Sequence, residues 1–136
     1  MSRVSGPLRD RFDLRIDVPP VGYTDLDLPP SAEGSAHVAQ RVLAARCRQH
    51  DRFAGHPTAT LNADAEGGLL EQIATPDTEA RALLSRAAER FHLSARGYHR
   101  VLRVARTIAD LEGVTDVRKP HLAEALSFRL PSMALA

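Results

Sequence analysis

The chain has few of the residues that build disulfides, metal sites and aromatic cores. Of its 136 residues one is cysteine, none is tryptophan and 4% are aromatic, although 43% are hydrophobic. The single Cys47 excludes an internal disulfide and is too few for a structural zinc site. The 6 histidines show none of the common paired-ligand spacings, so no metal site is expected. We therefore expect one core of leucine, valine, isoleucine and many alanines, as in close-packed helices.

The sequence also lacks the signatures of several functional classes. No G-x-x-x-x-G-K-[ST] loop occurs, so the chain is not expected to hold a triphosphate and magnesium, or to hydrolyse ATP, on its own. No G-x-S-x-G elbow supports a hydrolase. No N-terminal apolar stretch resembles a signal peptide or membrane span, which predicts a cytoplasmic protein of bacterial type and no membrane partner. The net charge is +1, so any anion binding must be local.

Residues 94–113 have the start, faces and stop of one complete helix. Ser94 can cap its N-terminus, and Gly113 can end it in a left-handed turn. Spacings of three and four residues predict a buried arc made of Ala95, Tyr98, Val101, Leu102, Ala105, Ile108 and Ala109. The opposite arc is predicted to point outward and carries Arg96, Arg100, Arg103 and Arg106, with His99 and Asp110.

Two interpretations fit this basic arc. One is a solvated face whose arginines pair with neighbouring carboxylates. The other is an anion site, most plausibly for phosphate, because guanidinium groups bind phosphate oxygens bidentately and stay charged. In that case Arg96 is the first candidate, because it lies in the first helical turn, where free N–H groups and the helix dipole also favour negative charge. Arg100 and Arg103 are further candidate anion ligands on the same arc.

Shorter helices are predicted on both sides of this central helix. Residues 35–53 form an amphipathic pattern capped by Ser31 or Ser35, and its basic outer face is predicted to be solvated: Arg41, Arg46, Arg48 and Arg52. A weak helix over residues 62–73 is interrupted by Gly67 and Gly68. Thr75 and Pro76 are predicted to open a helix to Phe91, and Pro120 to open the last one. The predicted fold is all-α, a four- to five-helix bundle over residues 35–130 with a tail at 131–136.

The N-terminal segment has a different pattern. Residues 12–18 alternate apolar and charged side chains and are stopped by Pro19 and Pro20, which predicts a half-buried strand. A single strand cannot form a sheet, and no other segment alternates as clearly. We therefore expect residues 1–34 to be an extended or disordered arm and linker left from the core of a longer protein, and residues 1 to about 30 to be mobile in isolation.

Two runs of sequence resemble one protein family. The run LSARGYHRVLRVARTIADLEG (residues 93–113), followed by HLAEALSFR (residues 121–129), resembles the C-terminal lid domain of magnesium-chelatase-like AAA+ ATPases of the ComM/YifB type. The run RVSGPLRDRFDLRIDV (residues 3–18) resembles the segment that closes the ATPase core in the same family. The two matches occur in the family's order and cover most of the chain.

The resemblance implies roles for particular residues. Arg11 matches the arginine finger that reaches the γ-phosphate of ATP held by the next subunit, and Asp10 lies at the same interface. Arg9 stands where the family normally has leucine, so either Arg9 or Arg11 could reach the neighbour. Arg96 matches the sensor-2 arginine, which the lid presents to the γ-phosphate in its own subunit, and Gly97 would allow close approach. ATP with Mg²⁺ is thus implied for the intact parent, and no cofactor for this chain alone.

The resemblance also implies partners. They are the missing AAA+ core, neighbouring subunits of a homo-oligomeric, hexameric ring, and DNA, with branch migration in natural transformation as the work driven by ATP. A lid of a true magnesium chelatase ATPase subunit is a related alternative. Two other classes stay open: a free-standing helical nucleic-acid-binding module, whose arginines would meet phosphates, and a bare assembly domain in which Arg96 is dispensable.

Overall fold

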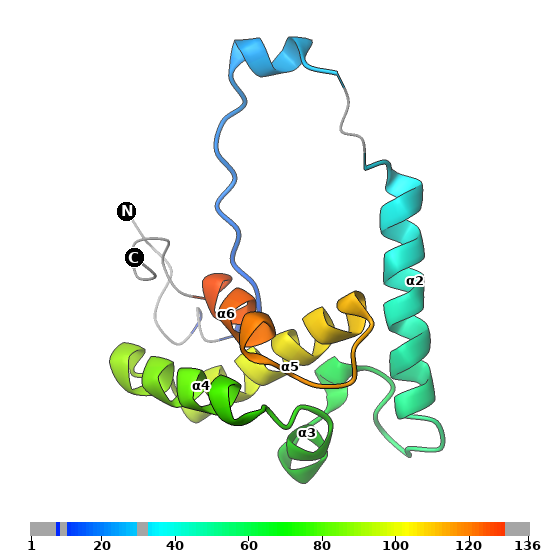
Figure 1. Ribbon diagram of the computed structural model, residues 1–136, viewed down its shortest axis with the longest axis vertical. Coiled ribbons are helices and arrows are strands. Elements are labelled where there is room, and N and C mark those ends of the chain that lie inside the picture. The colour runs from blue at the N-terminus through cyan, green and yellow to red at the C-terminus, as the bar shows by residue number, and fades with distance from the viewer. Residues whose placement is uncertain (1–7, 9–10, 30–32, 130–136) are drawn as a thin grey trace.

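The computed structural model describes Leu8, residues 11–29 and residues 33–129. It confirms the all-α fold: no strand is assigned anywhere in these ranges. The elements in chain order are a 3-10 helix η1 (Tyr23–Asp27), α2 (Ser35–Arg52), a 3-10 turn η2 (Asn62–Asp64), α3 (Gly67–Ile73), α4 (Thr78–Phe91), α5 (Ala95–Glu112) and α6 (Lys119–Ser127). Helices α3 to α6 gather into one body, and α2 stands upright beside it with its N-terminal half projecting (Figure 1).

Helix α5 is the centre of the body. It contacts α2, α3, α6 and η2, while α4 packs on α6. The core has the predicted composition: its fully buried members include Leu84, Val101 and Leu122 together with many alanines. Small alanine side chains let helix backbones approach closely, so the chain can form a dense core with few aromatic rings. Phe53 is the one aromatic side chain that is fully buried within the described ranges.

The ends of α5 are those predicted from the sequence. The Ser94 hydroxyl accepts a hydrogen bond from the Gly97 amide at 3.0 Å, which satisfies one of the free N–H groups of the first turn. At the other end Gly113 adopts φ +87°, a left-handed conformation that glycine takes without strain. The guanidinium of Arg48 also lies over Gly113, where a Cβ atom would come within 2.9 Å of Nη2. The turn therefore favours glycine at position 113, and a side chain there would also displace the Arg48 guanidinium.

The predicted start of α4, the predicted cap of α2 and the predicted continuity of the helix over 62–73 were wrong, whereas α2 does begin at Ser35 as predicted. Helix α4 begins at Thr78 and is capped by Asp77, whose carboxylate accepts from the Ala80 amide at 2.8 Å, because Pro76 instead pairs with Val117 in a short parallel bridge. Helix α2 is preceded by Gly34, without a side-chain cap, and Ser31 lies outside the described residues. The expected helix over 62–73 is split into η2 and α3, so the glycines open a helix that they were expected to interrupt.

The split has a local cause. The Asp64 carboxylate accepts hydrogen bonds from the Thr60 and Leu61 amides, both at 2.9 Å, which closes a tight turn at η2. These backbone bonds lower the pKa of Asp64 and so keep it ionised. Gly67 then takes φ +50°, a conformation that redirects the chain into α3.

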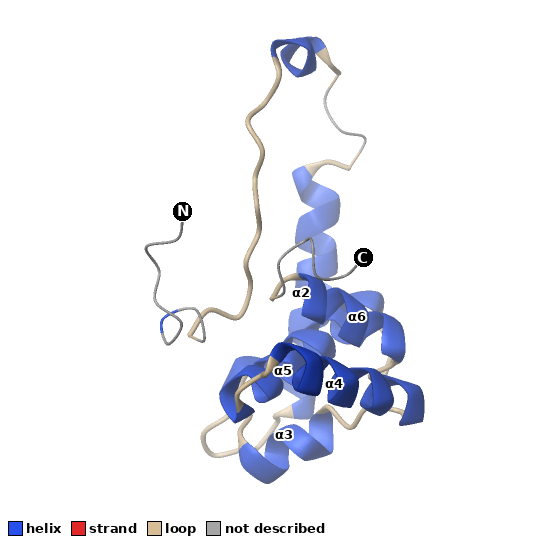
Figure 2. Ribbon diagram, turned by 90° about the vertical axis from the view of Figure 1, so that its left-hand side faces the viewer, coloured by secondary structure: helices blue, strands red, loops and turns tan. Residues whose placement is uncertain are grey.

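Residues 11–29 of the arm run as an extended segment from the body up to η1 (Figure 2). Residues 12–18 have the extended conformation of the predicted strand but no strand partner within the described part of the chain. Their apolar side chains face solvent: Phe12 is 56% exposed, Ile16 67% and Val18 84%. The Arg15 amide is nevertheless bound to the Phe128 carbonyl at 2.8 Å, so the arm touches the end of α6.

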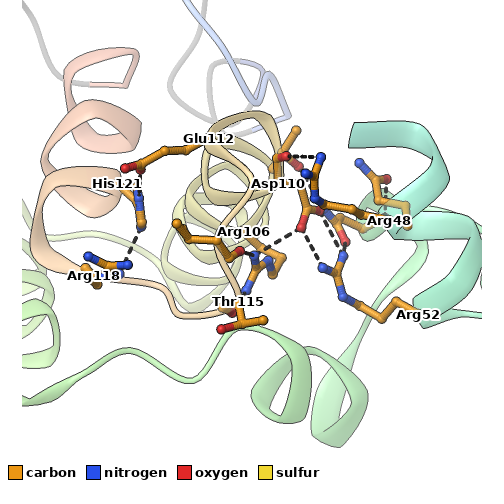
Figure 3. Close-up of polar contacts among 12 residues, drawn as sticks. Arg48, Arg52, Arg106, Asp110, Glu112, Thr115, Arg118 and His121 are labelled. Carbon is orange, nitrogen blue, oxygen red and sulfur yellow. Dashed lines mark hydrogen bonds and ion pairs between the residues drawn. The ribbon is translucent and has the colours of Figure 1, made fainter. Parts of the chain in front are cut away.

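A buried ionic network joins α2 to α5 and corrects the predicted exposure of Arg52, Arg106 and Asp110, of which Asp110 is 0% exposed (Figure 3). Arg106, predicted to point outward, is 1% exposed, and its guanidinium donates to Asp110 at 3.0 Å and to the carbonyls of Val114 and Thr115. Arg52, predicted to be solvated, binds both oxygens of Asp110 at 2.5 and 2.8 Å. Asn62 adds a third donor to Asp110 at 2.7 Å. Helical periodicity places charged side chains in water. It could not predict that these arginines instead bind the buried Asp110 carboxylate.

The network has a defined charge state. Burial raises the pKa of Asp110, but the hydrogen bonds from Arg52 and Asn62 and the charge of Arg106 outweigh it, so the net pKa is below its usual value. Burial lowers the pKa of Arg106, and Asp110 opposes that shift. Arginine stays protonated in proteins, so the buried group remains an ion pair.

The connection from α5 to α6 is held by a second polar group. His121 is 3% exposed; its Nδ1 accepts from the Arg118 amide at 2.9 Å, and its Nε2 meets the Glu112 carboxylate. Because Nδ1 is an acceptor, Nε2 carries the proton and donates to Glu112. The start of α6 is thereby fixed to the last turn of α5. No helix in the described ranges is long and apolar enough to span a membrane.

Replacing Asp110 by Ala should lower the free energy of unfolding by about 3–5 kcal/mol, because it leaves the Arg106 guanidinium buried without its counter-ion. Urea unfolding followed by circular dichroism would measure the loss. Asp51→Ala is the matched control, since Asp51 is exposed on α2 and should change stability by less than about 0.5 kcal/mol. Equal effects of the two substitutions would contradict the assigned role of the network.

The lowered pKa of Asp110 also predicts a pH dependence. The stabilisation is fully present above the unfolded pKa, about 4, and is lost as pH falls through the lower folded pKa. Urea midpoints measured from pH 7 to pH 3 should therefore fall more steeply for the wild type than for Asp110→Asn, which has no carboxylate to protonate. Parallel curves would show that Asp110 is not the responsible group.

Candidate functional site

The candidate site is an open cavity of about 680 Å³ at the N-terminal end of α5, here named the arginine cavity. Its lining comes from the arm, from α5 and from the start of α3: Arg11, Glu66, Gly67, Arg96, His99, Arg100 and Arg103. Every arginine proposed from the sequence as an anion ligand, finger or sensor, apart from Arg9, therefore faces one space. Among the described lining residues Glu66 is the one carboxylate against four arginines, so this part of the cavity is strongly basic.

Arg96 is the most available of these arginines. It is exposed in the first turn of α5 and makes no ion pair or side-chain hydrogen bond with any described residue. The cap by Ser94 fixes the turn on which it stands. The positive end of the helix dipole adds to its own charge, so the position favours an anion beyond what the guanidinium alone would supply.

Arg100, one turn further, is already engaged. Its side chain is 18% exposed and Nη1 lies 2.6 Å from the carboxylate of Asp13 on the arm. Its Nε atom is buried and has no hydrogen-bond partner among the described residues. Arg100 is thus held by one exposed carboxylate and retains unused donor capacity.

Arg103 is fixed more firmly. Its Nε donates to the Ala65 carbonyl at 2.8 Å, and Nη2 lies 3.5 Å from Glu66, whose side chain is 83% exposed. The bond to Ala65 ties α5 to the segment before α3. Arg103 therefore both lines the cavity and sets the position of its α3 wall.

Arg11 reaches the cavity because the arm is tied to the body. Arg129 donates to the Phe12 carbonyl at 2.9 Å, and Arg15 and Asp13 make the contacts already described. These links join residues more than 80 positions apart in the chain: 87 for Asp13 and Arg100, and 117 for Phe12 and Arg129. The position of Arg11 thus depends on long-range polar contacts of its neighbours.

Among the described residues, Gly97 and Arg106 do not line the cavity. Gly97 is buried and does not line the cavity; the Arg129 guanidinium occupies the space beside it, 3.2 Å from where a Cβ atom would stand. Its missing side chain makes room for the residue that holds the arm. Arg106 belongs to the ionic network. Asp10 and the alternative finger Arg9 lie outside the described residues.

Sequence reasoning missed Glu66, Gly67, Asp13 and Arg129 as parts of the site, and did not assign His99 to it. His99 carried a signal, since it shares the arc of Arg96 and Arg103. The others come from segments whose packing no local pattern indicates. The arrangement supplies cationic donors around an open space, which suits binding of a polyanion such as a chain of phosphates.

The fold and the cavity define a helical domain with a basic pocket at the start of its central helix. The chain belongs to the family described as magnesium chelatase, subunit ChlI C-terminal, whose model matches residues 32–129. The family resemblance noted from the sequence is thereby confirmed. The match begins just before α2 and ends after α6, so it covers the whole helical body.

Curated relatives extend the match into the arm. The chain is 41% identical over 130 residues to competence protein ComM of Haemophilus influenzae, a match that covers 95% of this chain and 25% of that protein. It is 38% identical over 131 residues to the uncharacterized protein YifB of Escherichia coli and 37% identical to YifB of Salmonella typhimurium, with the same coverage of 95% and 25%. The chain thus spans about a quarter of the length of these relatives.

The cap that positions Arg96 can be tested directly. Ser94→Ala should lower the free energy of unfolding by about 1 kcal/mol, because the Gly97 amide loses its acceptor. Ser85→Ala is a suitable control, since Ser85 is exposed inside α4 and alanine is the better helix former there. Thermal or urea unfolding of both variants would measure the difference. A Ser94→Ala protein as stable as the control would contradict the capping role.

Proposed function

We propose that this chain is the lid of an AAA+ ATPase and that the arginine cavity binds the terminal phosphates of its nucleotide. The observation that carries the proposal is the convergence of Arg11, Arg96, Arg100 and Arg103 on one cavity. Membership in the magnesium chelatase C-terminal family supports the lid assignment. The proposed ligand is ATP with Mg²⁺ bound by the intact parent, whose remaining part would supply the phosphate-cradling loop that this sequence lacks.

Arg96 is the residue proposed to sense the nucleotide. It stands at the helix N-terminus without a competing carboxylate in the described structure, so a phosphate oxygen is its natural partner. A γ-phosphate, present in ATP and absent in ADP, would change the contacts of Arg96 and hence the position of α5. Arg100 and Arg103 would bind the same phosphate chain from the next turns of the helix.

Arg11 is proposed as the arginine finger of the neighbouring active site. In this chain it lines the same cavity as Arg96, whereas a finger must reach a nucleotide held by another subunit. We propose that the docked arm is the resting arrangement and that the arm leaves the cavity when the ring assembles. The apolar side chains exposed along the arm would then be covered by the rest of the parent.

The wider role is proposed from the relatives. The name of ComM connects that protein with competence, and we propose that the parent of this chain is likewise a ring-forming ATPase of the cytoplasm that acts on DNA, with branch migration as its work. Its partners would be the AAA+ core, neighbouring copies in a hexamer and the DNA substrate. In this scheme the chain alone does not turn over ATP.

The binding of inorganic tripolyphosphate to the 136-residue chain tests the site. Isothermal titration calorimetry should detect binding, and Arg96→Ala should weaken it about tenfold, the loss expected for charge-assisted hydrogen bonds. Arg86→Ala is the matched control, because Arg86 is an exposed arginine on α4, away from the cavity. Equal affinities of the two variants would contradict the proposed role of Arg96.

The same variants separate the lid from a free-standing nucleic-acid-binding module. A module of that kind would bind short duplex DNA with an affinity that falls steeply with salt, and the loss of a single cavity arginine would change it little. The proposed lid should bind tripolyphosphate through Arg96 and duplex DNA weakly. Tight, salt-dependent DNA binding that survives Arg96→Ala would favour the module.

A further inference from the structure

Asp13 on the arm is paired with Arg100 of the arginine cavity, and we infer that its carboxylate competes with the anion for this arginine. An anion that takes Arg100 displaces Asp13 and releases the arm together with Arg11. The inference rests on the proposed function, because it requires that the cavity bind an anion. It makes Asp13 a residue that lowers the affinity of the cavity for the anion and that couples anion binding to release of the arm.

The geometry around Arg100 supports this role. The Asp13 carboxylate lies 2.6 Å from Nη1, the distance of a strong charge-assisted hydrogen bond. Asp13 is 52% exposed while Arg100 is 18% exposed, so the carboxylate approaches a largely enclosed guanidinium from the solvent side. An incoming phosphate would enter from that same side. The two anions therefore compete for the same guanidinium, and their negative charges would repel each other if both bound it.

Glu66 is a much weaker competitor. Its carboxylate lies 3.5 Å from Arg103, its side chain is 83% exposed, and Arg103 is held independently by the Ala65 carbonyl. Displacing Glu66 would leave Arg103 in place. Asp13 is thus the carboxylate whose displacement changes the structure.

The arm depends on such polar contacts because burial contributes little to its docking. Phe12, Leu14 and Ile16 are all at least half exposed. The described contacts that hold residues 12–15 are the Asp13–Arg100 pair, the bond from Arg129 to the Phe12 carbonyl and the bond from the Arg15 amide to the Phe128 carbonyl. With few contacts and little buried apolar surface, loss of one ion pair shifts the balance toward release.

The Asp13→Asn variant isolates the competition. It removes the charge but keeps the side-chain size, and inorganic tripolyphosphate should bind it about threefold more tightly than the wild type, as expected for a partly exposed ion pair. Asp17→Asn is the matched control: it removes the same charge from the same arm, but Asp17 pairs with Arg15 at 3.4 Å and not with a cavity arginine. Its affinity should stay close to that of the wild type.

Release of the arm has its own readout. The Arg15 amide is bonded to the Phe128 carbonyl, so its hydrogen exchange measured by NMR reports docking. Saturating tripolyphosphate should accelerate that exchange in the wild type, and in Asp13→Asn it should already be fast without ligand. Asp17→Asn should behave like the wild type.

Two results would overturn the inference in different ways. If tripolyphosphate binds and depends on Arg96, but Asp13→Asn matches Asp17→Asn in affinity and the Arg15 amide stays protected, the site stands and Asp13 is not its competitor. If the wild type, Asp13→Asn and Asp17→Asn all fail to bind tripolyphosphate, the proposed function fails and the competition fails with it.

Discussion

The Asp110 carboxylate, bound by Arg52, Arg106 and Asn62, is the interaction on which the arrangement of helices depends. It lies in the last turns of α5 and draws three separate parts of the chain onto that helix: the end of α2, the turn at η2 and the connection to α6. The buried charges must stay paired, because the loss of either partner would leave the other charge desolvated and would lower the free energy of unfolding. Once α5 is fixed by its C-terminal end, its N-terminal end projects a defined set of arginines into the cavity.

The same residue type serves opposite purposes along one helix. Arg106 is enclosed by carbonyls and a carboxylate, so its charge is neutralised and it acts as a structural tie. Arg96 lies ten residues earlier with no described partner, so its charge remains available. Arg100 and Arg103 are intermediate, each held by one carboxylate and still facing the cavity. The gradient follows from what meets the arginines of each turn: α2 and the connection to α6 enclose Arg106, whereas the arm and the segment before α3 only partly cover Arg100 and Arg103.

The sequence predicted the local features of this fold and failed where distant segments meet. Ser94 and Gly113 bound α5 as expected, because caps are set by neighbouring residues. The burial of Arg106 was missed because periodicity assigns a charged residue to the outer face, and its partners Val114 and Thr115 arrive only when the chain turns back. Pro76 failed to start α4 because it pairs with Val117. The cavity's arginines were found through their spacing and the family resemblance, whereas Asp13 and Arg129 join it across more than 80 residues of sequence.

Helix α2 is attached to α5 near its C-terminal end, and this affects how its movement would act on α5. Its 18 residues form a helix roughly 27 Å long. Near its C-terminal end, Arg48 and Arg52 donate hydrogen bonds to Asp110 in the last turns of α5. Its upper half stands clear of the body with Val38, Val42 and Leu43 exposed (Figure 1). Because Arg48 and Arg52 join α2 to the last turns of α5, a tilt of α2 would move Asp110 and, through α5, the turn that carries Arg96.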